Sequence, residues 1–275
     1  MLAGMSTRPA TVPNREESSG RRRDDACPGA LRLHAADDGA LARVRLPGGL
    51  LDASAARVLA DLAEEFGDGR IDLTSRGNMQ LRALPADCGT ELAGRLRAAG
   101  LLPSDTHERA RNIVATPLAG ARSGVHAVAR EVDRALCADP VAARLSGRFL
   151  FAVDDGRGDV AALDADVTLV APAAPGADPD TAPGAGRPDG WCLALGTGAR
   201  VTVRREDAAR AAILAARLFL TTGDTVAETA APDTAVGGRP DRIWRVTDLP
   251  ADLLPDTGRL IGALAAGGIS ADPDP

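Results

Sequence analysis

The chain contains no tyrosine and no lysine, and aromatic residues make up only 2% of its 275 residues. Few aromatic rings mean few platforms on which nucleic-acid bases stack. A net charge of −6 also argues against a nucleic-acid partner. All 32 basic residues are arginines, so any anion site must be a local arginine cluster. The hydrophobic cores must be built from Leu, Val, Ile and Ala.

Long apolar runs are also missing. No stretch reaches the roughly 18 apolar residues that a membrane span needs, and the amino-terminal residues carry no apolar signal segment. We therefore expect a cytoplasmic protein without membrane contact. The four cysteines, Cys27, Cys88, Cys137 and Cys192, lie far apart, without the close spacing of metal ligands. Buried free thiols are the expected state in the cytosol.

Composition divides the chain into four parts. Residues 1–26 are polar and charged, which predicts a disordered tail. Two folded blocks follow at 27–120 and 121–222, and the second contains a loop rich in Pro and Gly at 171–190. Residues 223–275 are expected to form a linker and short carboxy-terminal elements.

The first block shows the pattern of an α+β fold. Residues 42–46 alternate as a strand does, and Asp52 can cap a helix that ends near Phe66. A hairpin is predicted around the turn 75–78, followed by a helix at 87–99 and a strand at 113–115. This order is the split βαβ pattern of ferredoxin-like folds.

The second block predicts a mixed α/β domain. The expected elements are helices at 125–136 and 206–220 and strands at 148–153, 161–170, 191–195 and 201–203. The last part of the chain, 223–275, is expected to hold a strand-like patch at 243–246 and a short helix at 260–265. Asp154, Asp155 and Asp159 lie between two of these strands. They could hold a hard cation, but the closing Glu of a calcium loop is missing, which favours a hairpin turn.

Arginines recur on three segments of the first block: Arg43 with Arg45, Arg76 with Arg82, and Arg109 with Arg111. If these segments are neighbours in one sheet, their guanidiniums can converge into a receptor for carboxylates or phosphates. The alternative is the solvated face of amphipathic strands, and the pattern alone favours that alternative.

Several segments resemble one enzyme superfamily. ARVRLPGG (42–49), DLTSRGNMQLRAL (72–84) and ARNIVATPLAG (110–120) resemble signature blocks of nitrite/sulfite reductase half-domains. CPGALRLHAADDGALARVRLPGG (27–49) and GRFLFAVDDGRGDV (147–160) are similar to precorrin-3B synthase within that superfamily. The resemblance covers residues 27–222. It implies a ferredoxin-like half-domain followed by a mixed α/β domain of the sirohaem reductase type, as the amino-terminal half of the fold.

The resemblance also implies a ligand. Members of the superfamily cradle sirohaem, or a precorrin-type tetrapyrrole, beside a [4Fe–4S] cluster. By motif position, the tetrapyrrole carboxylates would be bound by Arg45, Arg76, Arg111 and Arg148. Residues expected nearby are Arg43, Asn78, Arg82, His107, Arg109 and Asn112. The family's next block carries two lysines in a pattern like RKFK, whereas residues 147–150 keep only Arg148 as a charge.

No metal ligand and no catalytic residue is assigned. The family's cluster ligands are paired, closely spaced cysteines of the second half, and this sequence does not show them. A second half-protein, or a homodimer, is therefore an expected partner.

Two functional hypotheses remain open. One is an oxidoreductase part of the precorrin-3B synthase type, in cobalamin biosynthesis, with sulfite or nitrite reduction as the alternative chemistry. The other is a non-catalytic half that binds a tetrapyrrole or a partner.

Overall fold

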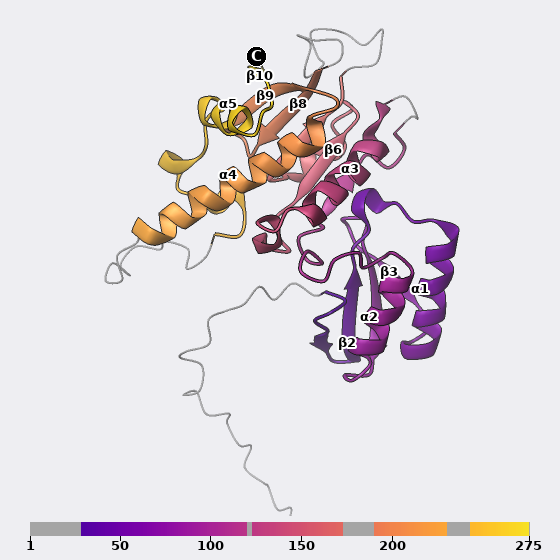
Figure 1. The fold of residues 1–275 in the computed structure, drawn as a ribbon. Coiled ribbons are helices and arrows are strands. Elements are labelled where there is room, and N and C mark those ends of the chain that lie inside the picture. The colour runs from indigo at the N-terminus through magenta and orange to yellow at the C-terminus, as the bar shows by residue number, and fades with distance from the viewer. Residues whose placement is uncertain (1–28, 120–122, 173–189, 230–242, 275) are drawn as a thin grey trace, which may run out of the picture.

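The computed structural model describes residues 29–119, 123–172, 190–229 and 243–274 (Figure 1). The tail expected at 1–26 and nearly all of the loop expected at 171–190 lie outside the described residues. Two sheets organise the chain, and each has a hydrophobic core of its own. Within the described residues, no helix has the length and apolar character needed to cross a bilayer.

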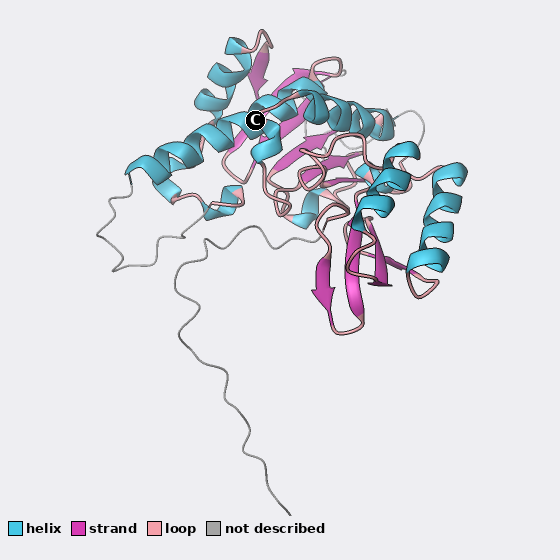
Figure 2. Cartoon of the chain, turned by 60° about the horizontal axis from the view of Figure 1, so that its bottom comes forward, coloured by secondary structure: helices cyan, strands magenta, loops and turns pink. Residues whose placement is uncertain are grey.

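The first unit is a four-stranded antiparallel sheet with two helices on one face (Figure 2). The strand order is β1-β2-β4-β3, with β1 at His34–Ala36, β2 at Gly39–Val44, β3 at Ile71–Leu73 and β4 at Met79–Leu84. The helices are α1 (Ala53–Phe66) and α2 (Gly89–Ala98). The predicted cap is confirmed, because the Asp52 carboxylate accepts a hydrogen bond from the Ala55 amide at 2.8 Å.

The strand expected at 113–115 forms, but it belongs to the second sheet. This strand, β5 (Ile113–Ala115), pairs in parallel with β6 (Phe151–Asp154). The edge beside β2 is instead occupied by β1, which the sequence pattern did not predict. All three residues of β5 are buried, and burial on both faces is typical of parallel strands. The three arginine-bearing segments therefore do not share one sheet.

The second unit is a six-stranded mixed sheet in the order β10-β9-β8-β7-β6-β5. The remaining strands are β7 (Val167–Val170), β8 (Gly190–Leu195), β9 (Ala199–Arg204) and β10 (Ala271–Pro273). β5, β6 and β7 run parallel, and the other pairs are antiparallel. One face is covered by α3 (Val125–Ala138), α4 (Ala208–Thr229) and α5 (Thr257–Ala266) (Figure 1). The fold class, α+β with a ferredoxin-like half domain and a mixed α/β unit, is thereby confirmed.

Short 3₁₀ helices complete the fold and correct two expectations. They are η1 (Pro47–Gly49), η3 (Ala142–Arg144), η4 (Ala161–Leu163), η5 (Val246–Asp248) and η6 (Ala251–Leu253). Because β6 and β7 are parallel, the segment between them is a crossover containing η4, and the expected hairpin turn is wrong. The patch at 243–246 is not a strand, since it leads into η5.

The two units are joined by polar contacts and close packing. A Cβ atom added at Gly48 of η1 would lie 3.2 Å from the Ala129 Cβ and 3.3 Å from the Ala115 Cβ. Arg111 donates to the Leu101 carbonyl at 3.0 Å. His107 Nε2 bonds the Asp139 carbonyl at 2.8 Å, which makes this nitrogen the protonated one. The end of β2 is thus held against β5 and α3.

Candidate functional site: an arginine-lined cleft

An open cleft of about 520 Å³ lies at the carboxyl end of β2 and beside the β3–β4 hairpin. Three arginines line it: Arg43, Arg45 and Arg76. The rest of the lining comes from β3, β4 and the turn between them, namely Asp72, Leu73, Thr74, Ser75, Asn78 and Gln80. A cleft with three guanidiniums and this polar lining suits a ligand with several carboxylates.

The turn between β3 and β4 is held in shape by its own side chains. The Thr74 amide donates to the Asn78 carbonyl at 2.9 Å, and the Asn78 amide donates to Thr74 Oγ1 at 3.0 Å. Gly77 has a φ of 69°, which favours glycine. The buried Asn78 side chain also accepts from the Leu46 amide at 3.0 Å, so the turn is fixed to the end of β2.

Arg43 is held by a neutral side chain. It lies directly opposite Gln80 on the neighbouring strand. With the Gln80 amide oriented to satisfy its surroundings, its oxygen accepts from Arg43 Nε at 3.1 Å and from Nη2 at 2.6 Å. An amide oxygen fixes the guanidinium but leaves its positive charge uncancelled.

Arg45 reaches the seam between the two units. Its Nη1 donates to Asn112 Oδ1 at 3.2 Å and its Nη2 to the Gly147 carbonyl at 3.5 Å, both of which are neutral acceptors. Burial raises the pKa of nearby Glu108, while the Ala30 amide and the charge of Arg45 act in the opposite direction. Arg45 is only 3% exposed, so it forms part of the buried wall of the cleft.

Several other arginines of the described chain are paired with carboxylates. Arg82 bonds Asp38 at 2.9 and 3.0 Å, Arg95 bonds Glu65 at 3.1 Å, and Arg97 bonds Asp105 at 2.9 and 2.6 Å. In such pairs the carboxylate neutralises the charge of the guanidinium. The neutral amide that binds Arg43 therefore leaves the positive charge of this guanidinium at the cleft.

The structure brings together only part of the site predicted from the sequence. Arg45, Arg76, Arg43 and Asn78 line the cleft, and Asn112 contacts Arg45. Gln80 and Asp72 line it too, and the sequence reasoning missed them. Their signal was the strand alternation, which places them on the same face as Arg43.

Five predicted residues lie elsewhere, and the contacts of four of them are as follows. Arg111 is buried and binds Asp133 through two hydrogen bonds of 2.7 and 2.9 Å. The Arg148 guanidinium lies over the Trp244 ring, 5.8 Å from its centroid. His107 is buried with Ser104 and the Asp139 carbonyl as partners, and the side chain of Arg82 binds Asp38. Neither these four residues nor Arg109 is among the residues that line the cleft.

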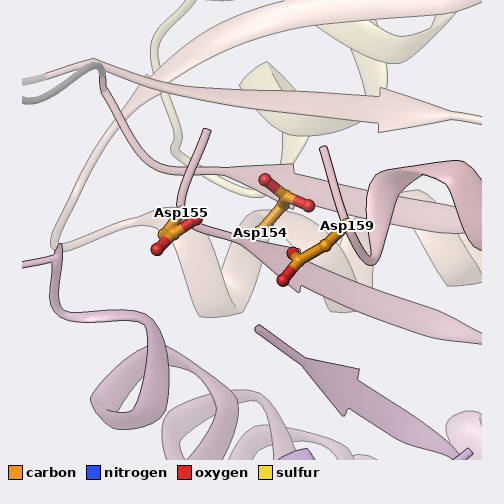
Figure 3. A group of neighbouring side chains, drawn as sticks. All are labelled: Asp154, Asp155 and Asp159. Carbon is orange, nitrogen blue, oxygen red and sulfur yellow. The ribbon is translucent and has the colours of Figure 1, made fainter. Parts of the chain in front are cut away.

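Three aspartates, Asp154 at the end of β6 and Asp155 and Asp159 just after it, lie together in the crossover (Figure 3). The buried Asp154 carboxylate accepts four backbone N–H groups, from Gly156, Gly158, Val160 and Ala161, at 2.8 to 3.0 Å. Burial by itself would raise the pKa of Asp154, but these four amides together lower it below its usual value. Asp154 therefore acts as the anion around which the loop folds.

The cysteines of the described residues do not fit an iron–sulfur cluster. Cys88 precedes α2, Cys137 lies in α3 and Cys192 in β8, and each is a free thiol. Burial raises the pKa of Cys137 and of Cys192 to about 11. Among the described residues, the one group of three or more His, Cys, Asp or Glu side chains close enough to share an ion is the aspartate trio.

Comparison with known proteins identifies the first unit. Residues 34–99 match the family described as the nitrite/sulfite reductase ferredoxin-like half domain. The chain is 33% identical over 127 residues to a ferredoxin–nitrite reductase of Synechococcus elongatus, covering 42% of this chain and 25% of that protein. It is 33% identical over 154 residues to a precorrin-3B synthase of Sinorhizobium sp, covering 54% of this chain and 33% of that protein.

A solved structure shows the same fold. The NirA protein of Mycobacterium tuberculosis superposes with a TM-score of 0.51 at 24% identity, over 64% of this chain and 33% of that one. The chain spans a third or less of the length of these relatives. The match at residues 34–99 and these relatives indicate that the first unit is a nitrite/sulfite reductase ferredoxin-like half domain, and the solved structure shows that the fold is shared.

Proposed function

We propose that this chain binds an anionic tetrapyrrole through the arginine-lined cleft, as part of an oxidoreductase of the precorrin-3B synthase type. The observation that carries the proposal is the presence of Arg43, Arg45 and Arg76 around one open cleft of the half domain. The relative named precorrin-3B synthase supports this direction. Precorrins and sirohaem carry many carboxylates around a flat ring, which is the chemistry that a cluster of guanidinium forks recognises.

The chain's own residues would bind and orient the macrocycle. Arg43 and Arg45 are fixed by Gln80 and Asn112, so little side-chain freedom is lost when a carboxylate binds them. Arg76 lies on the turn that Asn78 fixes to β2. A bound sirohaem would supply iron for electron transfer, and the protein's part is orientation and electrostatics.

The proposal assigns no step to a [4Fe–4S] cluster, because the described cysteines do not fit one. Arg148 and Arg111, which the family motifs point to, are also not given a direct ligand contact. Their side chains are occupied by Trp244 and Asp133.

The second candidate is a sirohaem-binding reductase of nitrite or sulfite. It is favoured by two relatives named ferredoxin–nitrite reductase, one of Synechococcus elongatus and one of Leptolyngbya laminosa. The Leptolyngbya laminosa protein is 38% identical over 80 residues, covering 28% of this chain and 16% of that protein. Comparing metal-free sirohydrochlorin with its iron complex, sirohaem, separates the two. A precorrin-type site retains the metal-free ring, whereas binding of sirohaem alone favours the reductase. A non-catalytic half would bind either ring without turning it over.

The test is a spectroscopic titration of the purified chain with uroporphyrin, an octacarboxylate porphyrin. Arg76→Ala should weaken binding by about 1.5–3 kcal/mol, the typical loss for a charged hydrogen bond. Arg95→Ala is the matched control, since Arg95 lies on α2 and binds Glu65 away from the cleft. Absence of binding by the wild type, or equal affinity of Arg76→Ala and Arg95→Ala, would contradict the proposal.

A further inference from the structure

Gln80 is the only glutamine in the chain, and it lines the arginine-lined cleft. On β4 it is in register with Arg43 of β2 on one side and with Asp72 of β3 on the other. The next residue along β4, Leu81, points to the opposite face and packs in the core beneath α1 and α2. Residue 80 therefore faces the cleft and lies outside the apolar core.

A carboxylate would be the ordinary partner for an arginine at this position. The chain has 38 acidic residues, and arginines elsewhere bond to them, as Arg82 does to Asp38 at 2.9 and 3.0 Å. Arg205 bonds Glu131 in the same way, at 2.7 and 3.0 Å. Opposite charges paired across two strands also stabilise a sheet. Stability alone therefore does not account for a neutral amide opposite Arg43.

The Gln80 amide holds Arg43 without neutralising it. Its oxygen accepts from Arg43 Nε at 3.1 Å and from Nη2 at 2.6 Å. A guanidinium has five N–H donors, so three donors of Arg43 are not used by Gln80. The carboxylate in the same row, Asp72, lies one strand further from Arg43, and Arg82 Nε is 4.0 Å from its Oδ2. Arg43 is thus fixed in place while its positive charge stays available to a ligand.

We propose that Gln80 is a positioning residue of the cleft, which fixes the Arg43 guanidinium and, being neutral, preserves its charge for a ligand carboxylate. This inference rests on the proposed tetrapyrrole-binding function and deepens it, because it makes the affinity for a carboxylate-rich ring depend on the charge of residue 80. A glutamate there would keep the size of the side chain and an acceptor for Arg43. It would also form an ion pair with Arg43, so that less of the guanidinium's charge reaches the ligand.

The first test is Gln80→Glu, titrated with uroporphyrin at low salt beside the wild type. We expect the variant to bind about three- to tenfold more weakly, because a carboxylate then neutralises Arg43. The loss should shrink at 1 M salt, where the screening length falls to about 3 Å. The variant should resist urea at least as well as the wild type, since it gains an ion pair across adjacent strands. Weaker binding by an equally stable protein cannot be the result of misfolding.

Gln80→Leu distinguishes positioning from charge. Leucine is neutral and of comparable size, but it offers Arg43 no acceptor. We expect about two- to threefold weaker binding of uroporphyrin, because Arg43 then loses more side-chain freedom when it binds a carboxylate. This loss should persist at 1 M salt, unlike that of Gln80→Glu. Binding as tight as that of the wild type would refute the positioning role.

An Arg43→Gln background shows whether the effect of residue 80 passes through Arg43. If Gln80→Glu acts by neutralising Arg43, its effect should become much smaller once the guanidinium is gone. An equally large loss in that background would mean that the new carboxylate repels the ligand directly, which contradicts the proposal. Thr90→Glu is the matched control. It adds the same charge at an exposed position on α2, on the helix-covered side of the sheet, and should leave the affinity unchanged.

The possible results separate the two claims. If the wild type binds uroporphyrin and Arg76→Ala weakens the binding, but Gln80→Glu binds as tightly as the wild type, the role of Gln80 is refuted and the proposed function stands. If the wild type does not bind uroporphyrin, the proposed function fails and the role of Gln80 fails with it.

Discussion

The partner of each arginine decides what that arginine does in this chain. Arg111 is buried against Asp133 and the Leu101 carbonyl, where it joins the two units. Arg43 is bonded by the neutral amide of Gln80 and faces a cleft. In sequence both arginines follow an alanine, and the motifs predict Arg111 at the ligand and Arg43 near it. The difference arises because their partners lie on other elements, which no local pattern identifies.

At the same scale, Asp154 provides a pH-dependent prediction. Its folded-state pKa lies below the usual 3.8, so its contribution to stability is present above that value and is lost as pH falls through the folded pKa. Asp154→Asn should lower the free energy of unfolding by about 2–4 kcal/mol at pH 7, because four amide donors lose a charged acceptor. The cost should shrink below pH 3.8. Urea unfolding of the variant and the wild type at pH 7 and below pH 3.8 measures this loss of stability. A loss that does not vary with pH would contradict this account.

At the scale of elements, the short helix η1 is the joint between the units. Its two glycines have similar backbone conformations, with φ of 68° at Gly48 and 66° at Gly49. Their surroundings differ, however. A Cβ at Gly48 would lie 3.2 Å from Ala129, whereas a Cβ at Gly49 meets nothing nearer than 3.9 Å. Substituting the two glycines one at a time therefore distinguishes the cost of backbone strain from the cost of steric crowding.

We expect Gly49→Ala to cost about 1–2 kcal/mol of stability, from the left-handed backbone alone. Gly48→Ala should cost a further 1–3 kcal/mol or so, because the new methyl group must push α3 or β5 away. Chemical denaturation of the two variants, compared with wild type, measures both values. Equal costs would mean that η1 yields easily and does not lock the units together.

Helices and strands with a clear period of hydrophobic residues were predictable from the sequence. The capped helix α1 and the β3–β4 hairpin formed close to their expected positions, because capping and alternation are local signals. The partner of β5 was not predictable, since Ile113, Val114 and Ala115 are apolar without alternation and fit either sheet. The crossover after β6 was mistaken for a hairpin because strand direction is set by distant pairing.

At the scale of the whole molecule, the candidate site depends on how the two units meet. Arg45 belongs to the first unit, but Asn112 and Gly147, which hold its guanidinium, belong to the second. Motif position was enough to point to Arg45, Arg76 and Asn78. It was not enough to exclude Arg111 and Arg148, because their orientation depends on the packing of α3 and on Trp244.

The buried thiols test whether the units unfold together. Cys88 lies in the first core and Cys192 in the second unit, and both are buried. In variants that keep either Cys88 or Cys192 and replace the other three cysteines, the remaining thiol should react with a disulfide reagent only as the protein unfolds in urea. We expect coincident midpoints, because the buried contacts of Arg45 and Arg111 couple the units. Well-separated midpoints would show that the two units are independent.

The basic side of the cleft consists of guanidiniums alone. A guanidinium stays protonated throughout the range in which cells operate, so the cleft does not lose its positive charge as the surroundings become alkaline. A lysine or histidine cluster would titrate, and its affinity would drift with pH. Here the protonation of the ligand's own carboxylates sets the acid limit of binding, and occupancy above that limit is governed by ionic strength.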